Sequence, residues 1–203
     1  MTILCLVRHG QTDWNVQGRW QGVVDQKLNF TGLAQASQVA NELAEKHFTA
    51  IYSSDLGRAL TTAMIIAKTH NLPVITLPGL REINMGDWEG KLGIDIPLLY
   101  PLEWAELLRS PVGSHPPGGE SLIDLSRRVV PAMTELVLRH PDETILVVSH
   151  GLALAVFLCH VYSIPLENAF DKIPKNACAT WIEWSPTGIH GEQISNKKNM
   201  ADG

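Results

Sequence analysis

The sequence predicts a three-layer α/β/α sandwich with a mainly parallel central sheet. Short apolar runs rich in β-branched residues alternate along the chain with longer segments whose apolar residues recur at helical spacing. The first run, residues 4–7, is apolar at every position, which is typical of a strand covered by helices on both faces. Strands that alternate with helices in this way favour parallel pairing.

The predicted strands span residues 4–7, 50–53, 73–77, 144–148 and 177–184. The predicted helices run from a cap at Thr31 to about 45, from near Asp55 to about 71, over 122–139 and over 151–162. Pro131 falls inside the third helix, where we expect a kink or a break. The residues expected to face the core are Leu33, Ala36, Val39, Ala40 and Leu43 in the first helix, and Leu60, Met64, Ile65 and Ala67 in the second.

Length and composition indicate one domain. The chain has 203 residues, of which 45% are hydrophobic, enough to bury one substantial core. Residues 91–120 are rich in proline and glycine yet contain several large apolar residues. We therefore expect a single domain over residues 1–203, with a lid-like insertion at about 91–120 that holds a short helix, and a polar tail from about 190.

Charge and cysteine content narrow the class of partner. The net charge of −5 argues against a broad surface for nucleic acid or anionic membranes, and leaves room for a small basic pocket. Cys5, Cys159 and Cys178 are odd in number and lie in apolar segments, so we expect buried thiols in a reducing compartment. With no signal peptide recognised at the N-terminus, the expected location is cytoplasmic.

One uncharged segment, residues 144–162, approaches the length of a membrane-spanning helix. Ser149-His150-Gly151 interrupts it near the middle, with β-branched residues before this tripeptide and helix formers after it. The pattern indicates a buried strand, a tight turn and a buried helix, so no membrane span is expected.

Polar groups follow the first four predicted strands: Arg8-His9, residues 54–58 with Arg58, Arg81-Glu82 and Ser149-His150. Because the carboxyl ends of parallel strands meet at one edge of a sheet, these groups should converge there. Guanidinium groups bind phosphate oxygens in a bidentate manner, and a neutral imidazole can accept a phosphoryl group covalently. A carboxyl group can protonate the leaving oxygen and then activate water. The set predicts phosphoryl transfer without a cofactor, and no HxH or HExxH spacing suggests a metal.

The same residues belong to longer motifs that occur in order over nearly the whole chain. They are Leu6-Val7-Arg8-His9-Gly10-Gln11-Thr12-x-Trp14-Asn15, Arg19-x-Gln21-Gly22-x-x-Asp25, Ser53-Ser54-Asp55-Leu56-x-Arg58-Ala59, Glu82-x-x-x-Gly86-x-Trp88-Glu89-Gly90 and Ser149-His150-Gly151. Together they resemble the histidine phosphatase superfamily, in its phosphoglycerate-mutase-like branch. Gln11 stands where glutamate is usual in that family, which removes a negative charge beside the pocket and should leave catalysis intact.

The resemblance implies a role for each site residue. His9 would be the phosphorylated nucleophile, and Glu82 would be the proton donor and acceptor. The transferred phosphoryl group would be bound by Arg8, Arg58 and His150. Four further positions, Asn15, Gln21, Gly22 and Gly151, would line the substrate pocket. For Trp14, Trp20 and Trp88 we expect packing beneath the loops, and His115 stands out because it lies in the insertion.

Within the family we favour a phosphomonoester phosphatase acting on a small phosphorylated metabolite. The chain resembles short bacterial members, which include broad-specificity, α-ribazole and metal-independent phosphoserine phosphatases. The cofactor-dependent mutases are longer, with an additional insertion and a tail that covers the site. Phosphoglycerate mutase-type transfer, a phosphoprotein or phosphohistidine phosphatase, a non-catalytic phosphate-binding module and a metal hydrolase remain alternatives. A homodimer is left open.

Overall fold

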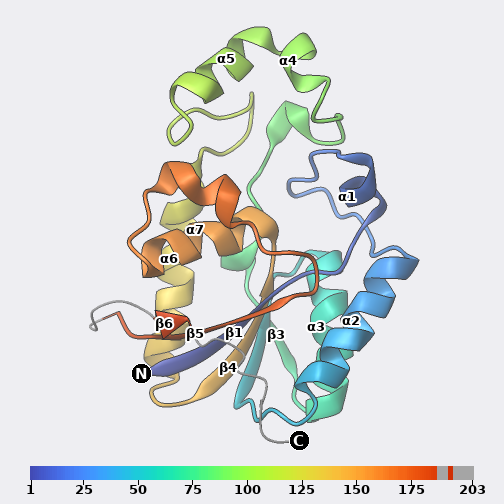
Figure 1. Cartoon of the computed structure of the whole chain (residues 1–203), viewed down its shortest axis with the longest axis vertical. Helices are drawn as coiled ribbons and strands as arrows, with labels where there is room; N and C mark the ends of the chain where they lie inside the picture. Colours follow the sequence, from blue (N-terminus) through green and yellow to red (C-terminus); the bar gives the residue numbers. More distant parts are fainter. Residues whose placement is uncertain (187–191, 194–203) are drawn as a thin grey trace, which may run out of the picture.

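The computed structural model describes residues 1–186 and 192–193, which form a six-stranded sheet between two layers of helices (Figure 1). The strand order is β3-β2-β4-β1-β5-β6. In chain order the strands are β1 (Thr2–Arg8), β2 (Ala50–Ser53), β3 (Val74–Thr76), β4 (Thr144–Ser149), β5 (Ala179–Trp184) and β6 (Glu192–Gln193). The first four strands are parallel to one another, whereas β5 runs antiparallel to β1 and β6 antiparallel to β5. The predicted fold class is confirmed.

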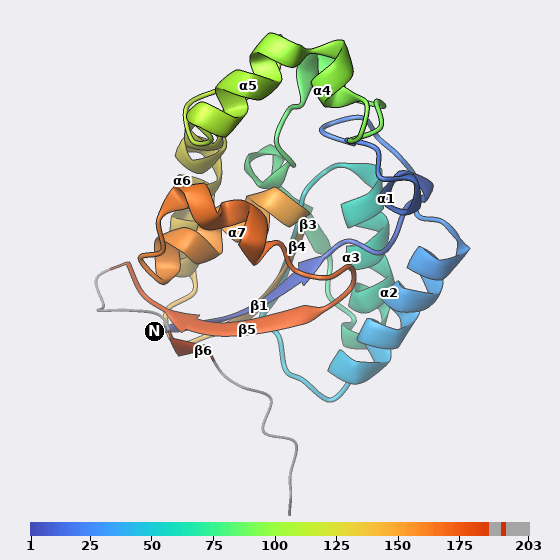
Figure 2. The same cartoon turned by 45° about the horizontal axis from the view of Figure 1, so that its top comes forward.

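Two helices cover each face of the sheet (Figure 2). Those on one face are α2 (Phe30–Leu43) and α3 (Gly57–His70), and those on the other are α6 (Leu122–Arg139) and α7 (Gly151–Val161). The connecting segments contain α1 (Asp13–Gln17), α4 (Ile96–Leu99), α5 (Pro101–Arg109) and the short 3-10 helices η1 (Pro78–Leu80), η2 (Gly86–Trp88) and η3 (Leu166–Lys172).

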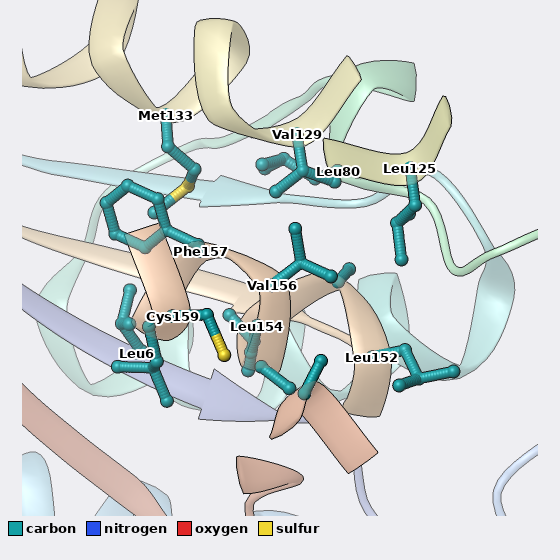
Figure 3. Close-up of a cluster of buried hydrophobic side chains, with 14 of the residues drawn as sticks. Leu6, Leu80, Leu125, Val129, Met133, Leu152, Leu154, Val156, Phe157 and Cys159 are labelled. Atoms are coloured by element: carbon teal, nitrogen blue, oxygen red, sulfur yellow. The ribbon is translucent and has the colours of Figure 1, made fainter. Parts of the chain in front are cut away.

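The hydrophobic core has two clusters, one on each face of the sheet, and alternate side chains of β1 belong to different clusters. Leu4 and Leu6 pack into the cluster that includes α6 and α7, whereas Cys5 and Val7 pack against α2 and α3. Figure 3 shows the first cluster, in which side chains from α6 and α7 meet those of β1. Since successive side chains of a strand point to opposite faces, an unbroken apolar run needs helices on both sides.

Three sequence expectations for the helices on the first face were wrong. The cap of α2 is Asn29 and not Thr31, because the Asn29 side chain accepts a hydrogen bond from Gly32 N at 2.8 Å. Leu33 is consequently exposed. In α3, Met64 is exposed, and Leu60 and Ile65 are only partly buried. The buried face is Arg58, Ala59, Thr62, Ala63, Ile66 and Ala67, because small residues let the helix approach the sheet while two polar ones reach the site.

Elsewhere α6 continues through Pro131 without the expected break. Pro131 lies on the exposed side, where water can bind the carbonyl group that lost its helical partner. The insertion holds two helices, α4 and α5, instead of one. Cys5 and Cys159 are buried as expected, but Cys178 is exposed, since it lies in the loop that leads into β5.

The polar tail expected from about 190 falls almost entirely outside the described residues. Within the described part of the chain, no helix is long and apolar enough to cross a membrane. The uncharged segment 144–162 is divided between β4 and α7, as predicted.

Close backbone contact joins the loop after β1 to the start of α2. A Cβ atom at Gly10 would lie 2.4 Å from Gly32 O, and a Cβ at Gly32 would lie 2.0 Å from Gln11 O. Gln11 O also accepts a hydrogen bond from Asn29 N at 3.0 Å. This contact ties the loop that carries His9 to the first face of the sandwich.

Substituting Gly32→Ala should therefore destabilise the protein. We expect the free energy of unfolding to fall by about 2 kcal/mol or more, because the obstructing atoms belong to the backbone and cannot rotate away. Urea unfolding followed by circular dichroism measures the loss. Gly113→Ala is the matched control, since the atom nearest to its added Cβ is Ser110 Oγ at 3.6 Å. Equal losses in the two variants would contradict the prediction.

Candidate active site

The predicted polar groups meet at the carboxyl edge of β1, β2 and β4. A cavity of about 310 Å³ is lined there by Arg8, His9, Arg58 and Glu82, together with the predicted pocket residues Asn15, Gln21, Gly22 and Gly151. His150 is fully buried beside them, with its ring centroid 5.2 Å from that of His9. The structure thus brings all the predicted site residues together.

His9 follows the last residue of β1, and its two ring nitrogens have different partners. Nδ1 lies 2.7 Å from Gly10 O, a contact that requires Nδ1 to carry the proton. Nε2 accepts a hydrogen bond from Arg58 Nε at 3.3 Å. Nε2 is therefore unprotonated and holds its lone pair toward the guanidinium group.

Both histidines are neutral near pH 7. Burial, and next the positive charges of Arg58 and Arg8, hold the pKa of His9 well below 6.5. The pKa of His150 is lowered in the same way, first by burial and then by the charge of Arg58. A neutral imidazole with a free lone pair is a nucleophile.

Arg58 extends from the first turn of α3 and is 1% exposed. Its Nη1 donates to Val24 O and its Nη2 to Gly22 O, both at 2.7 Å. Burial lowers the pKa of this guanidinium, while the charge of Glu82 acts in the opposite direction. Arg8 donates from Nη1 to Pro174 O at 2.8 Å, and its buried Nε has no partner among the described residues.

Glu89 holds the loop that receives Arg58, a role the sequence did not reveal. Its Oε1 accepts hydrogen bonds from Val23 N at 2.7 Å and Met85 N at 3.2 Å. Gly22 has φ +54°, and a Cβ there would lie 1.9 Å from Glu89 Oε1. A side chain here would strain the left-handed backbone and would displace the Glu89 side chain, so glycine is strongly favoured.

Ser54 contacts one ring nitrogen of His150. Its Oγ lies 2.8 Å from His150 Nε2 and accepts a hydrogen bond from Leu56 N at 3.3 Å. Donating its own proton to Nε2 leaves no hydroxyl hydrogen unpaired, so the ring proton of neutral His150 lies on Nδ1. Nδ1 is buried and has no partner among the described residues.

Glu82 lies at the amino end of α7. Its Oε2 accepts from Leu152 N at 3.2 Å, and its Oε1 accepts from Ala153 N at 3.2 Å and from Ile83 N at 3.0 Å. Unpaired N–H groups at a helix start favour negative charge. Arg81, the next residue back, turns away from the cavity and pairs with Asp55, its Nε 2.7 Å from Oδ1.

Asn176 is a second residue that sequence reasoning missed. Its Nδ2 donates to His9 O at 2.9 Å and lies 3.4 Å from Asn15 Oδ1. Nothing in the sequence near position 176 marks it, because it approaches the site only through the turn that reverses the chain into the antiparallel β5. It restrains the backbone of His9, whereas Arg58 contacts the side chain.

The tryptophans pack beneath the loops as expected. Trp88 is 1% exposed and lies 5.9 Å from Trp20 and 6.1 Å from Trp104, measured between ring centroids. Trp20 also lines the cavity. His115 lies apart from this cavity, in a separate hollow next to α5. Among residues 1–186 and 192–193, no group of three or more histidine, cysteine or acidic side chains is placed to hold a metal ion.

Comparison with known proteins agrees with this geometry. The sequence profile of the histidine phosphatase superfamily (branch 1) matches residues 4–197. The chain belongs to this superfamily. It is 37% identical to phosphoserine phosphatase 1 of Hydrogenobacter thermophilus, over 97% of this chain and 90% of that protein.

Two further similarities cover other named activities. The probable phosphoglycerate mutase GpmB of Proteus mirabilis is 40% identical over 79% of this chain and 74% of its own length. The structure of a mycobacterial glucosyl-3-phosphoglycerate phosphatase in complex with VO₃ superimposes with a TM-score of 0.84 and 32% identity, over 95% of this chain and 97% of that one. Membership in the family and phosphatase-named relatives support phosphatase activity.

The neutral state of the buried histidines predicts how stability depends on pH. Their folded pKa values lie below the unfolded value of about 6.5, so the unfolded chain binds more protons once the pH falls below that value. The free energy of unfolding should therefore be highest above about pH 6.5. As the pH decreases below 6.5, it should decrease by up to about 1.4 kcal/mol per pH unit for each histidine.

Urea unfolding at pH 7.5, 6.5 and 5.5 tests this dependence. The variants His9→Gln and His150→Gln should each show a shallower decline than the wild-type protein, because each removes one group that must stay neutral. A decline of the same steepness in all three proteins would contradict the assignment.

Proposed function

We propose that the protein is a metal-independent phosphomonoester phosphatase that forms a covalent phosphohistidine on His9 and acts on a small phosphorylated metabolite. The observation that carries the proposal is the unprotonated Nε2 of His9, hydrogen-bonded to buried Arg58 in a cavity also lined by Arg8 and Glu82. A phosphoryl dianion placed there meets two fixed cations and a nucleophile.

In the first half of the reaction, the Nε2 lone pair of His9 attacks phosphorus in line with the ester oxygen. The N–P bond forms as the P–O ester bond breaks, and Glu82, in its protonated form, delivers a proton to the departing oxygen. Gly10 O accepts a hydrogen bond from the Nδ1–H group of His9, and this bond stabilises the positive charge that develops on the ring. Arg8, Arg58 and the Nδ1 proton of His150 bind the equatorial oxygens, where charge spreads in the transition state.

The second half returns the enzyme to its starting state. Glu82, now a carboxylate, takes a proton from water as the water oxygen attacks phosphorus. The P–N bond breaks, orthophosphate leaves, and the electron pair returns to Nε2. Because the arginines supply the positive charge, the scheme requires no metal ion.

The proposal extends to the setting of the reaction. The expected partner is the small-molecule substrate, since a net charge of −5 provides no broad surface for nucleic acid. Three cysteines without a disulfide support a reducing, cytoplasmic environment. Segment 91–120 contributes Gly93 to the cavity wall, which supports its proposed role as a lid.

The role of His9 is tested by His9→Ala with phenyl phosphate as substrate. We expect kcat/KM to fall about 1,000-fold or more, because His9 is the one histidine, cysteine, serine or threonine in the described lining of the cavity. When the wild-type enzyme is quenched rapidly after mixing with ³²P-labelled substrate, we expect protein-bound label that is stable in base and labile in acid, as a phosphohistidine is. Label that is stable in acid should be absent. Arg81→Gln, which lies outside the cavity, is the control and should keep activity. Full activity in His9→Ala would favour a different nucleophile, and loss of wild-type activity with EDTA would favour a metal hydrolase.

The role of Glu82 is tested by the identity of the leaving group. Glu82→Gln should slow release of ethanol from ethyl phosphate by about 100-fold or more, because ethoxide cannot leave without a proton. Release of 4-nitrophenolate, which needs no proton, should survive as a burst equal to the amount of enzyme. Equal slowing of both first steps would show that Glu82 does not donate the proton.

The relative named as a probable mutase makes phosphoryl transfer the second candidate. Incubation with 2,3-bisphosphoglycerate and a monophosphoglycerate acceptor separates the two activities. We expect orthophosphate as the main product. Transfer to the acceptor that clearly exceeds hydrolysis would establish a mutase instead.

A further inference from the structure

Arg19 is the one charged side chain in the described cavity lining that has not yet been assigned a role. Beyond the residues already assigned, the lining includes Arg19 and the apolar side chains of Trp20, Ile83, Met85, Leu152 and Ile173. In the described part of the chain, Glu82 is the one carboxylate in the cavity lining. The described lining thus adds a cation and an apolar wall to the residues already assigned.

Arg19 has neutral partners only. Its Nε donates to Gln17 Oε1 at 2.7 Å and its Nη1 to Gly90 O at 2.6 Å. Among the described residues no carboxylate lies within ion-pair distance of it, whereas Arg81 and Arg128 each pair with an acid. The two neutral contacts fix the guanidinium at the cavity wall and leave Nη2 available to a ligand.

Among the charged groups that line the cavity, Arg19 is the one left uncompensated when a phosphoryl group is bound. Asp25 and Glu89 also act on Arg58, but they lie outside this lining. A phosphoryl dianion balances Arg8 and Arg58. His9 and His150 are neutral, and Glu82 is neutral when it holds the proton that it donates. One positive charge then remains beside the leaving group. An anion there would gain a charged hydrogen bond, and an ammonium group would face a like charge without a carboxylate to accept from it.

We propose that Arg19 is a specificity-determining residue that selects phosphomonoesters whose leaving group carries a carboxylate or similar anion on a short apolar body, and disfavours those with an ammonium group. The inference rests on the proposed phosphatase function and adds the charge preference at the same site. The phosphoserine phosphatase relative acts, by its name, on a substrate whose leaving group is zwitterionic. Among the described residues, the cavity lining offers Arg19 to the anionic part of such a group and, apart from Glu82, no carboxylate to its cationic part.

Three probes of similar size and different charge test the proposal: phosphoglycolate with a carboxylate, ethyl phosphate with no charge, and phosphoethanolamine with an ammonium group. Wild-type kcat/KM should fall in that order, with phosphoglycolate about tenfold better than ethyl phosphate, as expected for one charged hydrogen bond. In Arg19→Met this ratio should fall to about one, and the disadvantage of phosphoethanolamine should shrink. Arg19→Lys should restore part of the preference.

The ratio separates selection from support of the fold. If Arg19 serves only to hold Gly90 O, the variant loses activity on all three probes equally and the ratio stays at its wild-type value, which would overturn the proposal. Arg127→Met is the matched control. It removes the same charge from the exposed surface of α6, where the side chain is 78% exposed, and should leave the ratio unchanged.

A ratio that falls equally in Arg127→Met would attribute the preference to the overall field and would also overturn the proposal. Failure of the underlying function gives a different result, since the wild-type enzyme would then hydrolyse none of the three probes. A wild-type enzyme that cleaves all three at equal rates leaves the phosphatase function standing and refutes the role of Arg19.

Discussion

The site depends on the burial of Arg58 against His9. A buried guanidinium is costly unless its donors are paired, and here the backbone carbonyls of the 22–24 loop and His9 Nε2 accept from it. The same charge helps keep His9 neutral. One interaction thus does three things. It orients the imidazole, keeps the lone pair on Nε2 unprotonated, and holds a cation where phosphoryl oxygens would lie.

That interaction imposes conditions on distant parts of the chain. Arg58 can reach the cavity because α3 turns its Arg58 and Thr62 face toward the loops. Thr62 Oγ1 in turn accepts from Gly10 N at 3.1 Å and ties α3 to the loop that follows His9. The carbonyls that receive Arg58 are held by Glu89, which strongly favours glycine at position 22. The positions of several elements around the site therefore depend on Arg58: the ends of the strands, one face of α3 and the two loops that contact it.

The sequence predicted the parts of the structure that follow from local pattern. Unbroken apolar strands identified the sandwich, and polar residues directly after β1, β2 and β4 identified the site. Prediction from the sequence failed where contacts between distant segments determine a cap, a buried face or an ion pair. Thr31 and Asn29 are both good helix caps, and the choice of Asn29 depends on how the Gln11 loop packs against α2. Met64 belongs to an apolar stripe of α3, but this stripe does not face the core, because the face with Arg58 and Thr62 is directed toward the loops of the site. Arg81 is next to Glu82 in sequence, yet its side chain pairs with Asp55, in the loop that follows β2.

Residues that act through hydrogen bonds to other residues were the hardest to foresee. Asn176 has ordinary neighbours in sequence, and Ser54 belongs to a motif that gave it no role of its own. The importance of these residues comes from the contacts of Ser54 with His150 and of Asn176 with His9 O. Ser54 changes how His150 should be understood. A histidine beside two arginines and a phosphate is readily taken for a third cation, but here burial opposes its charge, and the serine hydroxyl places the ring proton on Nδ1. In the mechanism that we propose, His150 would then contribute a neutral hydrogen bond to the phosphoryl group, and the positive charge of the described site would come from its arginines.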